Sequence, residues 1–444
     1  MADVRPLPGI RYAAADQLAT LVTPPYDVIS PEAQARYYAR HPENIIRLEL
    51  GRDEPGDDAL NNRYTRAAAT FAEWRLRGVL RQDTPALYLY EQRFTWDGRA
   101  YRRLSLLARV RLEPWEAGVI LPHERTLAKP KDDRLKLLRA CAANLSPLMA
   151  LYDDPHQELA RLLQPSLEQA PDADFTDETG ERHRLWAPRD EALAPSVAAF
   201  FAPRRLYMAD GHHRYETALA YRDEQAALRK GDLPTDDPAR FTLMALAAVE
   251  DPGLLVLPTH RILRDLDPAT VAALPSLLDR HFTVEPLAAP ADAPAALTGL
   301  AEAQHAGATA FIAAGLRETL LLRLRSAGRA AMDHTSGEDG EEGNAADAWR
   351  RLDLAVLHEL VLRQALGITG AMVRAGQHIS YTRDAATALA AARADATGGT
   401  LALLVNATPP AAIRDVARAG GRMPQKSTYF YPKLITGLVI NPLW

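Results

Sequence analysis

Five consecutive residues in the middle of the chain, DGHHR, combine an acid, a glycine, two histidines and an arginine where a helix is predicted to begin. We expect Asp210 to cap this helix, because an aspartate side chain accepts hydrogen bonds from first-turn amides. Gly211 allows the backbone to bend tightly and to approach a ligand. His212, His213 and Arg214 then fall in the first turn, where cations meet the positive end of the helix dipole. A bound anion would compensate for these cations, and a phosphate fits best.

The alternative for DGHHR is a capped helix whose histidines lie at the surface. Tyr215, Ala218 and Leu219 follow at helical spacing, so one face of the helix is predicted to pack inward in either case. A single histidine in the first turn would favour the surface interpretation. The combination of all five residues favours the phosphate site, since the electrostatic conflict needs a compensating charge.

A second group of polar residues lies in GVILPHERTLAKPKDDRLKLL, as a proline-bounded loop before a predicted helix. It carries His123, Glu124, Arg125, Lys129 and Lys131. Loops with this many charges and apolar flanks often reach a ligand. Two lysines can hold a polyphosphate as point charges, and Glu124 can act as a base or as a metal ligand. The alternative is a charged loop that contacts only solvent.

A third group lies near the C-terminus, in MPQKSTYFYPK. Lys426, Ser427 and Thr428 match the last three letters of a Walker A loop, but the preceding glycines are not at the required spacing, which excludes a P-loop. Together with Lys433 and the interleaved aromatic residues, they can offer phosphate donors beside a stacking surface. Alternatively, the segment is a strand that docks on the first domain. Both interpretations hold if docking brings this segment to a pocket at a domain interface.

Three residues near the N-terminus are weaker candidates for substrate binding. Asp27, in PPYDVIS, can contact a substrate or a metal, although the pattern fits an aspartate in a turn at least as well. Asn44 and Arg47, in NIIRLELG, can bind a substrate carboxylate, although Arg47 is equally compatible with an exposed position on a strand. The adjacent histidines of DGHHR are poorly spaced for a metal on a helix, where a spacing of i, i+4 is preferred.

Local patterns predict the elements that must position these residues. PPYDVIS is predicted to be a turn that leads into a short strand, and NIIRLELG a half-buried strand. Between them, Ser30 and Pro31 mark the start of a helix, and Gly78 ends the next one. A hairpin that turns at Asp97 and Gly98 follows. DGHHR is expected between a short strand and its helix, and a buried strand, RFTLMALAAVE, comes after that helix.

These elements predict an α+β arrangement for the first part of the chain and α/β for the second. We expect a first domain over residues 1–264 with a helical insertion at 153–203, and an alanine-rich second domain over 265–420. Residues 421–444 are expected to dock at the domain interface. The acidic, glycine-rich stretch at 337–343 is predicted to be a mobile loop.

Composition narrows the classes of function. The 444 residues suffice for two or three domains, and 47% apolar with 25% charged residues is ordinary for a soluble globular protein. The net charge of -5 gives no argument for nucleic acid binding. The lone Cys141 excludes an intramolecular disulfide and a cysteine-based zinc site. Because neither a secretory signal nor an apolar run of about 18 residues is present, we expect a cytoplasmic protein without membrane contact.

DGHHR, followed by an aromatic residue and a helix, resembles the signature of the ParB/sulfiredoxin superfamily and is nearest in spelling to its free serine kinase branch. The whole chain resembles a prokaryotic family catalogued as domain of unknown function 1015, at PPYDVIS, LPHERT with NLSP, ADGHHRYETA, LPTHRIL and MPQKSTYFYPK. The resemblance implies a ParB/sulfiredoxin-like first domain whose strand-turn-helix binds nucleotide phosphates. Sulfiredoxin redox chemistry is not implied, because Gly211 stands where that branch has its reactive cysteine.

The resemblance also implies residue roles. The turn at Gly211 and the two following amides would cradle a phosphate, with His213 and Arg214 neutralising its charge. Asp210 would take a proton from an attacking hydroxyl or hold Mg²⁺. The kinase branch also uses an N-terminal acid as base, for which Asp27 and Glu124 are both candidates.

The candidate site combines the residues and the resemblance. The predicted catalytic residues are Asp210, His213 and Glu124, with Asp210 also the metal ligand. The predicted nucleotide-binding residues are Gly211, His212, Arg214, Lys129, Lys131, Lys426, Ser427 and Thr428, and the predicted substrate-binding residues are Asp27, Asn44, Arg47 and His123. The expected reaction is phosphotransfer from ATP or another nucleotide, with Mg²⁺, to a small hydroxyl metabolite such as serine. Two alternatives stay open: a phosphomonoester hydrolase in the same site, and a regulator that binds nucleotide without turnover.

Overall fold

The computed structural model of the 444-residue chain describes residues 1–124, 128–287, 292–336 and 344–444. The chain divides into two compact units. Unit 1 comprises Met1–Pro122, Thr126–Leu255 and Pro432–Trp444, and unit 2 comprises His123–Arg125 and Val256–Tyr431. The division thus falls after Leu255, where the sequence pattern placed it after residue 264, and the C-terminal segment is shared between the two units.

Unit 1 is built on a nine-stranded sheet with the order β6-β11-β8-β12-β5-β4-β10-β9, in which β1 also pairs with β5. β11 runs parallel to β6, β12 runs parallel to β8, and the other pairings described for this sheet are antiparallel. The strands of unit 1 are β1 (Val4–Arg5), β2 (Ile10–Tyr12), β3 (Leu80–Gln82), β4 (Tyr88–Trp96), β5 (Arg99–Arg111), β6 (Ile120–Leu121), β7 (Ala143–Asn144), β8 (Leu148–Tyr152), β9 (Ala173–Thr176), β10 (Arg182–Trp186), β11 (Leu206–Asp210), β12 (Phe241–Ala248) and β21 (Asn441–Pro442), and β13 (Leu255–Val256) lies at the division. Mixed pairing of this kind agrees with the predicted α+β class.

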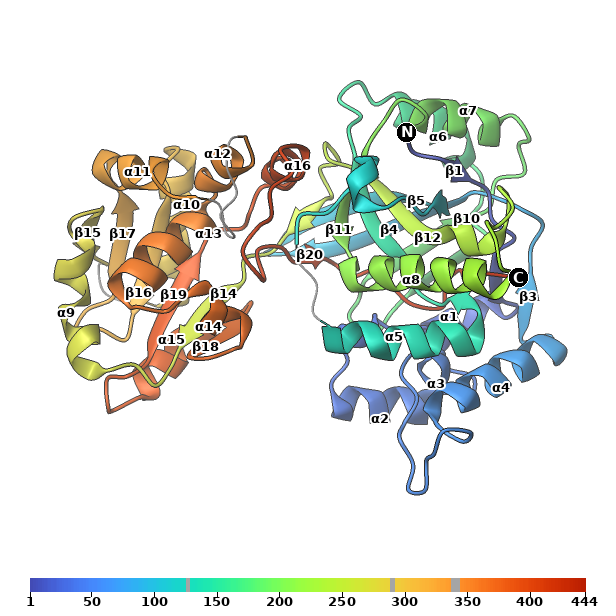
Figure 1. Ribbon diagram of the computed structural model, residues 1–444, viewed down its shortest axis with the longest axis horizontal. Coiled ribbons are helices and arrows are strands. Elements are labelled where there is room, and N and C mark those ends of the chain that lie inside the picture. Colours follow the sequence, from blue (N-terminus) through green and yellow to red (C-terminus); the bar gives the residue numbers. More distant parts are fainter. Residues whose placement is uncertain (125–127, 288–291, 337–343) are drawn as a thin grey trace. The chain divides into compact units, whose positions relative to one another are not determined.

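The helices of unit 1 surround this sheet, and Figure 1 shows α5 and α8 side by side. They are η1 (Ala15–Gln17), α1 (Leu18–Leu21), η2 (Tyr26–Val28), α2 (Pro31–Arg40), α3 (Ile46–Glu49), α4 (Arg63–Leu76), η3 (Trp115–Ala117), α5 (Ala128–Cys141), α6 (Glu158–Leu167), α7 (Leu193–Phe201), α8 (His212–Leu228) and η4 (Pro238–Arg240). Side chains from α6 and α7 join the strand residues Ala150, Met208 and Leu246 in one apolar core.

The C-terminal segment binds to unit 1 through backbone and side-chain hydrogen bonds. Gln92, on β4, donates to the carbonyl of Lys433 at 3.1 Å, and Arg109, on β5, donates to the side-chain oxygen of Asn441 at 2.9 Å. The short strands β21 and β7 pair antiparallel. This segment therefore brings Lys433 to the sheet that carries DGHHR.

Several predicted elements of unit 1 are confirmed. The side chain of Ser30 caps α2 by accepting from the amide of Ala33, and Pro31 is its first residue. β4 and β5 form the predicted hairpin around Asp97 and Gly98. DGHHR lies between β11 and α8, and the buried strand that follows is β12.

The two strands predicted near the N-terminus are wrong. NIIRLELG forms the short helix α3, because the side chain of Asn44 accepts from the amide of Ile46 at 2.9 Å and starts a helical turn. Ile46, Leu48 and Glu49 are all buried, so burial does not alternate as a strand requires. PPYDVIS contains the 3-10 helix η2 in place of a strand, closed by an amide-to-carbonyl bond across the turn.

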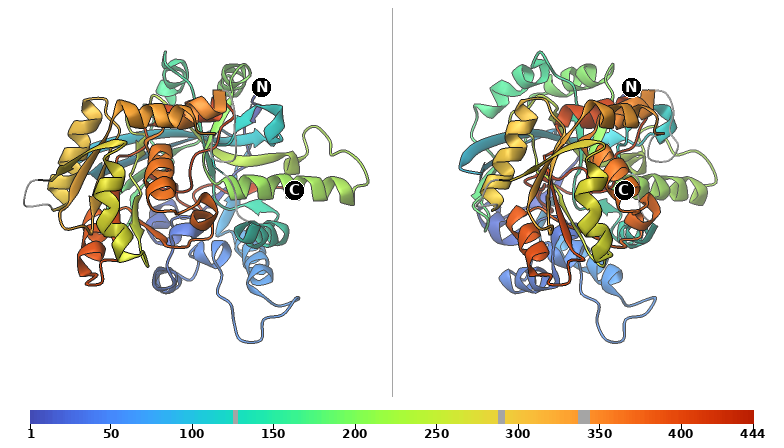
Figure 2. Two further views of the ribbon diagram at one scale, coloured as in Figure 1. Left: turned by 60° about the vertical axis from the view of Figure 1, so that its left-hand side comes forward. Right: turned by 90° about the vertical axis from the view of Figure 1, so that its left-hand side faces the viewer.

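Unit 2 contains a six-stranded sheet with the order β15-β17-β16-β19-β14-β18, and its described pairings are antiparallel. Its strands are β14 (His260–Leu263), β15 (Phe282–Pro286), β16 (Ala310–Ala314), β17 (Leu320–Leu324), β18 (Ile379–Thr382) and β19 (Leu401–Val405), with β20 (Phe430–Tyr431) apart from that sheet. Its helices are α9 (Pro268–Leu278), α10 (Ala293–His305), α11 (Ser326–Asp333), α12 (Asn344–Arg350), α13 (Asp353–Val356), the π-helix η5 (Leu357–Ala365), α14 (Gly370–Arg374), α15 (Ala385–Ala394) and α16 (Pro410–Arg418). Alanine-rich faces of α10 and α15 pack on the sheet, and Figure 2 gives two further views of these helices.

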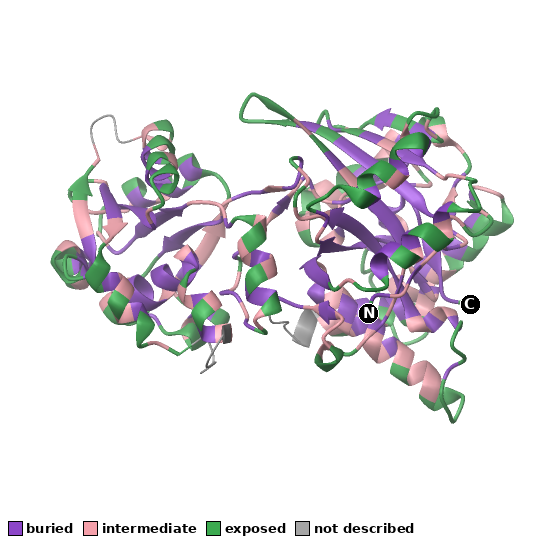
Figure 3. Ribbon diagram, turned by 90° about the horizontal axis from the view of Figure 1, so that it is seen from above, coloured by how far each residue is buried: buried purple, intermediate pink, exposed green. Residues whose placement is uncertain are grey.

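Figure 3 shows that burial is concentrated in the strands of each unit, with exposed residues along the outer helical faces. None of the helices in the described part of the chain has the length and apolar character that crossing a membrane requires.

Candidate functional site

The DGHHR motif forms a tight strand-to-helix turn in unit 1. The pairing of β11 with β8 is irregular between Met208 and Asp210, and α8 begins at His212. Gly211 between them has a φ of +92°, in the left-handed region that favours glycine. A Cβ atom at this position would also lie 2.7 Å from the side chain of Leu148. Backbone conformation and crowding therefore both require the glycine.

Asp210 is not the cap of α8, contrary to the prediction; the cap position is Gly211. As the last residue of β11, Asp210 directs its carboxylate to two cations. Oδ1 accepts from Lys433 Nζ at 2.5 Å, and Oδ2 accepts from Arg214 Nη2 at 3.0 Å. Burial alone would raise the pKa of Asp210, but Lys433 and Arg214 outweigh it and hold the pKa well below its ordinary value. The carboxylate is thus an ionised anchor.

Arg214 lies in the first turn of α8 and is fixed from several sides. Its Nη1 donates to Ser146 Oγ and to the carbonyl of Pro147, each at 2.9 Å, in addition to the contact with Asp210. The cation in the first turn therefore already has a carboxylate partner within the protein. This corrects part of the electrostatic argument from sequence, because the conflict at the helix terminus is compensated locally.

A second buried ion pair adjoins Arg214. Glu49, at the end of α3, is 2% exposed, and its Oε1 lies 3.4 Å from Nη1 of Arg134 on α5. Ser146 connects the two pairs, because its hydroxyl donates to Glu49 at 3.4 Å and accepts from Arg214. Burial raises the pKa of Glu49, although Arg134 and Arg214 oppose this effect. The ring of Tyr26 covers the guanidinium of Arg134 at 4.0 Å.

We call these six residues the Asp210 cluster: Asp210, Arg214, Lys433, Ser146, Glu49 and Arg134. Several of them line a narrow cavity of about 50 Å³, which holds a few water molecules at most. Arg214 and Lys433 share the carboxylate of Asp210, and Arg134 pairs with both Glu49 and the neighbouring Asp133. Arg214 and Lys433 each carry several N–H donors, so an anion is a chemically suitable further partner for both.

Sequence reasoning missed Glu49, Arg134 and Ser146 as parts of this cluster. Ser146 lies in NLSP, one of the sequence landmarks, so a signal for it was present. Glu49 was a lone acid in an apolar segment that was assigned to a strand. Lys433 was noted among possible phosphate donors, but its partner lies 223 residues away in the chain.

Three other predicted site residues of unit 1 make contacts outside the Asp210 cluster. Lys131, on α5, donates to Glu216 of α8 at 2.8 Å. Asn44 is buried and bonds the backbone of α3 and the carbonyl of Thr20. Arg47 donates to two backbone carbonyls and stacks on a tyrosine. These contacts fix local structure.

Asp27 is exposed in η2 and interacts electrostatically with Arg214, so the fold brings it toward the Asp210 cluster. His212 is buried and His213 is half-buried in the first turn of α8. The carbonyl of His213 accepts from the hydroxyl of Thr217 at 2.8 Å, as part of the helix.

Unit 2 brings the second and third groups of polar residues together. His123 is fully buried, and its Nε2 lies 3.1 Å from Thr428 Oγ1. That hydroxyl lies 3.3 Å from Glu124 Oε1. His123, Glu124 and Thr428 therefore form one hydrogen-bonded group, which we call the Glu124 group.

Lys426 and Ser427 shape the turn before Thr428. Ser427 is buried, and its hydroxyl donates to the carbonyl of Pro424. Lys426 has a φ of +58°, and its carbonyl accepts from Arg261 at 3.4 Å. The side chains of Arg125 and Lys129 and the stretch at 337–343 lie outside the described residues.

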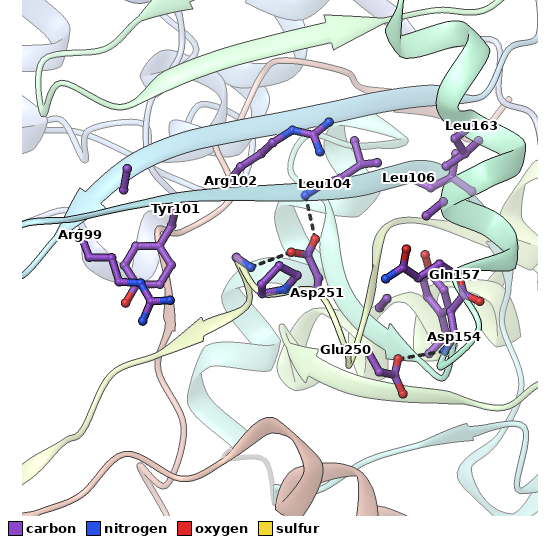
Figure 4. A pocket seen from close by; sticks show the side chains of 16 residues that line it. Arg99, Tyr101, Arg102, Leu104, Leu106, Asp154, Gln157, Leu163, Glu250 and Asp251 are labelled. Carbon is purple, nitrogen blue, oxygen red and sulfur yellow. Dashed lines mark hydrogen bonds between the residues drawn. The ribbon is translucent and has the colours of Figure 1, made fainter. Parts of the chain in front are cut away.

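A larger hollow in unit 1, of 410 Å³, lies between β5, α6 and the turn after β12. Figure 4 shows three carboxylates around it, with Asp251 accepting from the amides of Leu104 and Gly253 and Glu250 from the amide of Asp154. The carboxylate of Asp154 accepts from the amides of Glu158 and Leu159 at the start of α6. Its acids therefore serve the fold, and we assign no chemistry to them.

Within the described residues, Asp177, Glu181 and His183 have ligand atoms that all lie within 4.8 Å of one another. Both ring nitrogens of His183 are already engaged, Nδ1 with the hydroxyl of Tyr90 at 2.8 Å and Nε2 with Asp177 at 3.2 Å. We assign no metal to this group.

Comparison with family models identifies the family. The model described as "Protein of unknown function (DUF1015)" matches residues 4–355, which include PPYDVIS, LPHERT and DGHHR. The chain belongs to this family. Its description states no activity, so membership adds no function by itself.

Comparison with curated proteins gives no match. Among solved structures, a conserved hypothetical protein from Pyrococcus furiosus is similar with 11% identity and a TM-score of 0.33, over 74% of this chain and 92% of that one. A free serine kinase mutant in complex with AMP has 12% identity and a TM-score of 0.32, over 73% and 87% of the two chains. Another mutant of a free serine kinase, in complex with ADP, has 11% identity, a TM-score of 0.32 and the same coverage. Likenesses this remote carry no argument about mechanism.

Proposed function

We propose that this protein transfers a phosphoryl group from ATP or another nucleotide to a small hydroxyl metabolite of the serine class. The observation that carries the proposal is the Asp210 cluster, where Arg214 and Lys433 both bind the carboxylate of Asp210 at the DGHHR turn. Phosphoryl transfer depends mainly on positioning and charge neutralisation, which suits a cluster rich in cations and poor in nucleophiles. Serine is the chosen acceptor because DGHHR shares its spelling with the free serine kinase branch.

In this proposal, the phosphate lies at the N-terminus of α8. The helix begins after a glycine, which has no side chain to cap the first-turn amides. A phosphate there would accept from those amides and from Arg214 and Lys433. Asp210 would then act as the anchor that orients both cations.

Asp210 is a poor proton acceptor for the reaction. Both oxygens of Asp210 accept from cations, and its pKa lies well below the ordinary value, which makes it a weak base at neutral pH. Glu124, whose Oε1 lies 3.3 Å from the hydroxyl of Thr428, stays a predicted catalytic residue.

Mg²⁺ fits Asp210 poorly. A divalent cation would share the carboxylate with Lys433 and Arg214, which already occupy both oxygens. Mg²⁺ in nucleotide sites takes most of its ligands from phosphates and water, with one or two carboxylates. We therefore derive no step through Mg²⁺ at Asp210 and leave that assignment as a prediction.

An activity assay tests the proposal against its alternatives. The purified protein is incubated with ATP, Mg²⁺ and serine, and separately with phosphoserine, and ADP and free phosphate are followed. Serine-dependent ADP release supports phosphotransfer, whereas phosphate released from phosphoserine alone replaces it with a hydrolase. Nucleotide binding without turnover across a panel of small alcohols would instead identify a regulator.

A further inference from the structure

Two buried side chains of unit 1, outside the Asp210 cluster, bind the backbone at Lys433. They are Gln92 on β4 and Arg103 on β5, which are direct partners in the antiparallel ladder, so their side chains lie on one face of the sheet. Both are buried, and Nη2 of Arg103 donates to the side-chain oxygen of Gln92. We call these two residues the Gln92–Arg103 clamp.

The clamp holds two consecutive carbonyls of the C-terminal segment. Nη2 of Arg103 donates to the carbonyl of Pro432 at 2.6 Å, and Nε2 of Gln92 donates to the carbonyl of Lys433 at 3.1 Å. Pro432 is the first residue of the C-terminal stretch that belongs to unit 1. The clamp therefore fixes the segment where it enters unit 1, at the residue whose side chain contacts Asp210.

A second anchor lies three residues further along the segment. The amide of Thr436 donates to the carbonyl of Thr23 at 2.7 Å, and the amide of Thr23 donates to the carbonyl of Thr436 at 3.4 Å. The backbone of Lys433 is thus held on both sides. Because a lysine side chain is a flexible four-carbon stem with high rotamer entropy, a fixed backbone reduces the space that its ammonium group samples.

Arg103 contributes charge as well as hydrogen bonds. Burial lowers the pKa of Arg103, and nearby negative charges, among them those of Asp251 and Asp210, oppose this effect. A neutral donor would hold the carbonyl of Pro432 with a smaller cost of burial. An arginine at this position therefore holds the segment and also adds positive potential near Asp210.

We propose that Gln92 and Arg103 are positioning residues, which hold the ammonium group of Lys433 against Asp210 and direct it to the DGHHR turn. When the clamp opens, the backbone at Lys433 gains freedom and the ammonium group leaves Asp210 more often. The placement of Lys433 follows from the clamp alone. Its use in binding a phosphate rests on the proposed phosphotransfer.

Hydrogen exchange of the Lys433 ammonium group tests the clamp in the full-length protein without nucleotide. The chain has six lysines, and in ¹H–¹⁵N spectra of ¹⁵N-lysine-labelled protein the Lys433 signal is assigned by its loss in Lys433→Met. Gln92→Met keeps the size and neutrality of the side chain but removes the donor to the carbonyl of Lys433. We expect exchange at Lys433 to become about five-fold faster, the equivalent of one neutral hydrogen bond.

The matched control is Gln34→Met, which removes another side-chain hydrogen bond to a backbone carbonyl of unit 1, that of Leu50 at 2.8 Å. It should leave exchange at Lys433 unchanged. A merely structural role of Gln92 would lower the free energy of unfolding without changing this exchange, and equal exchange in Gln92→Met and wild type overturns the clamp. If Gln92→Met does not fold, the wild type decides, because a Lys433 ammonium that exchanges as fast as that of the more exposed Lys131 is not held in place.

Adding ATP separates the clamp from the proposed function. A phosphate that contacts Lys433 should slow exchange of its ammonium group about ten-fold further, since it adds a charge-assisted hydrogen bond. If ATP leaves this exchange unchanged while Gln92→Met still accelerates it, the clamp stands and the phosphate does not bind at Lys433. If ATP slows it while Gln92→Met has no effect, the phosphate site stands and the clamp is wrong.

Discussion

The Asp210 cluster of unit 1 and the Glu124 group of unit 2 both contain a carboxylate, but their partners differ in kind. Asp210 contacts two full cations at 2.5 and 3.0 Å, whereas Glu124 contacts a neutral hydroxyl at 3.3 Å. In the Asp210 cluster, Lys433 and Arg214 hold the pKa of Asp210 well below its ordinary value. In the Glu124 group, the hydroxyl of Thr428 and the imidazole of His123 can each donate or accept a proton. We therefore propose that Asp210 anchors charge, and a role of Glu124 in proton exchange stays a prediction.

Replacing the anchor should have the largest effect. Asp210→Asn keeps the shape but leaves Lys433 and Arg214, whose side chains are 11% and 13% exposed, without their carboxylate. Because breaking a largely buried ion pair is costly, we expect a loss of about 3–5 kcal/mol in the free energy of unfolding. Chemical denaturation at pH 7 measures it. A loss below about 1 kcal/mol would contradict the anchor role.

The pH dependence of the stability lost in Asp210→Asn provides the control for this experiment. The pKa of Asp210 is lower in the folded protein than in the unfolded chain, where it is about 3.9. The ion pair therefore stabilises the fold above about pH 4, and this contribution is lost as the pH falls toward the folded pKa. The difference in stability between wild type and Asp210→Asn should be constant from pH 5 to 7 and shrink below about pH 4. A difference independent of pH would mean that lost packing, and not charge, causes the destabilisation.

Gly211→Ala should have the next largest effect. The substitution places a Cβ at a φ of +92° and 2.7 Å from Leu148. Backbone strain and crowding together should cost about 3 kcal/mol. The matched control is Gly180→Ala, with a φ of +85° and nothing within 4 Å of the added atom, for which we expect about 1 kcal/mol. Thermal unfolding of both variants measures the difference, and equal losses would show that crowding at the turn is absent.

Arg214→Ala tests whether the cluster binds an anion. We expect ATP affinity to fall about 30-fold, because a charge-assisted hydrogen bond to phosphate contributes roughly 2 kcal/mol. The control is Arg139→Ala, which removes a half-exposed arginine of α5 that pairs with Glu224 of α8. Isothermal titration calorimetry with ATP compares them. Unchanged ATP affinity in Arg214→Ala would show that the phosphate does not bind at the DGHHR turn.

The two clusters also show how far sequence can go. The turn around Gly211 and the hairpin at Asp97 follow from local rules, and both are present. The role of Asp210 could not follow from such rules, because Lys433 reaches it from 223 residues away and competes with helix capping. α3 was missed for a related reason: all its apolar positions are buried by tertiary packing, which hides the helical period. Long-range pairing, more than local propensity, decides where charge is placed.

Thr428→Val should have the smallest effect on stability, and it tests the Glu124 group. It keeps the side-chain shape but removes the hydroxyl between His123 and Glu124. The loss of stability should be about 1 kcal/mol, the typical net value of one hydrogen bond. If Glu124 is the base, the pH profile of turnover should shift as well, because its hydrogen-bond partner is gone, and Thr428→Ser should restore it. A profile that stays fixed while Asp210→Asn shifts it would reverse the assignment, making Asp210 the group that exchanges protons despite its two cations.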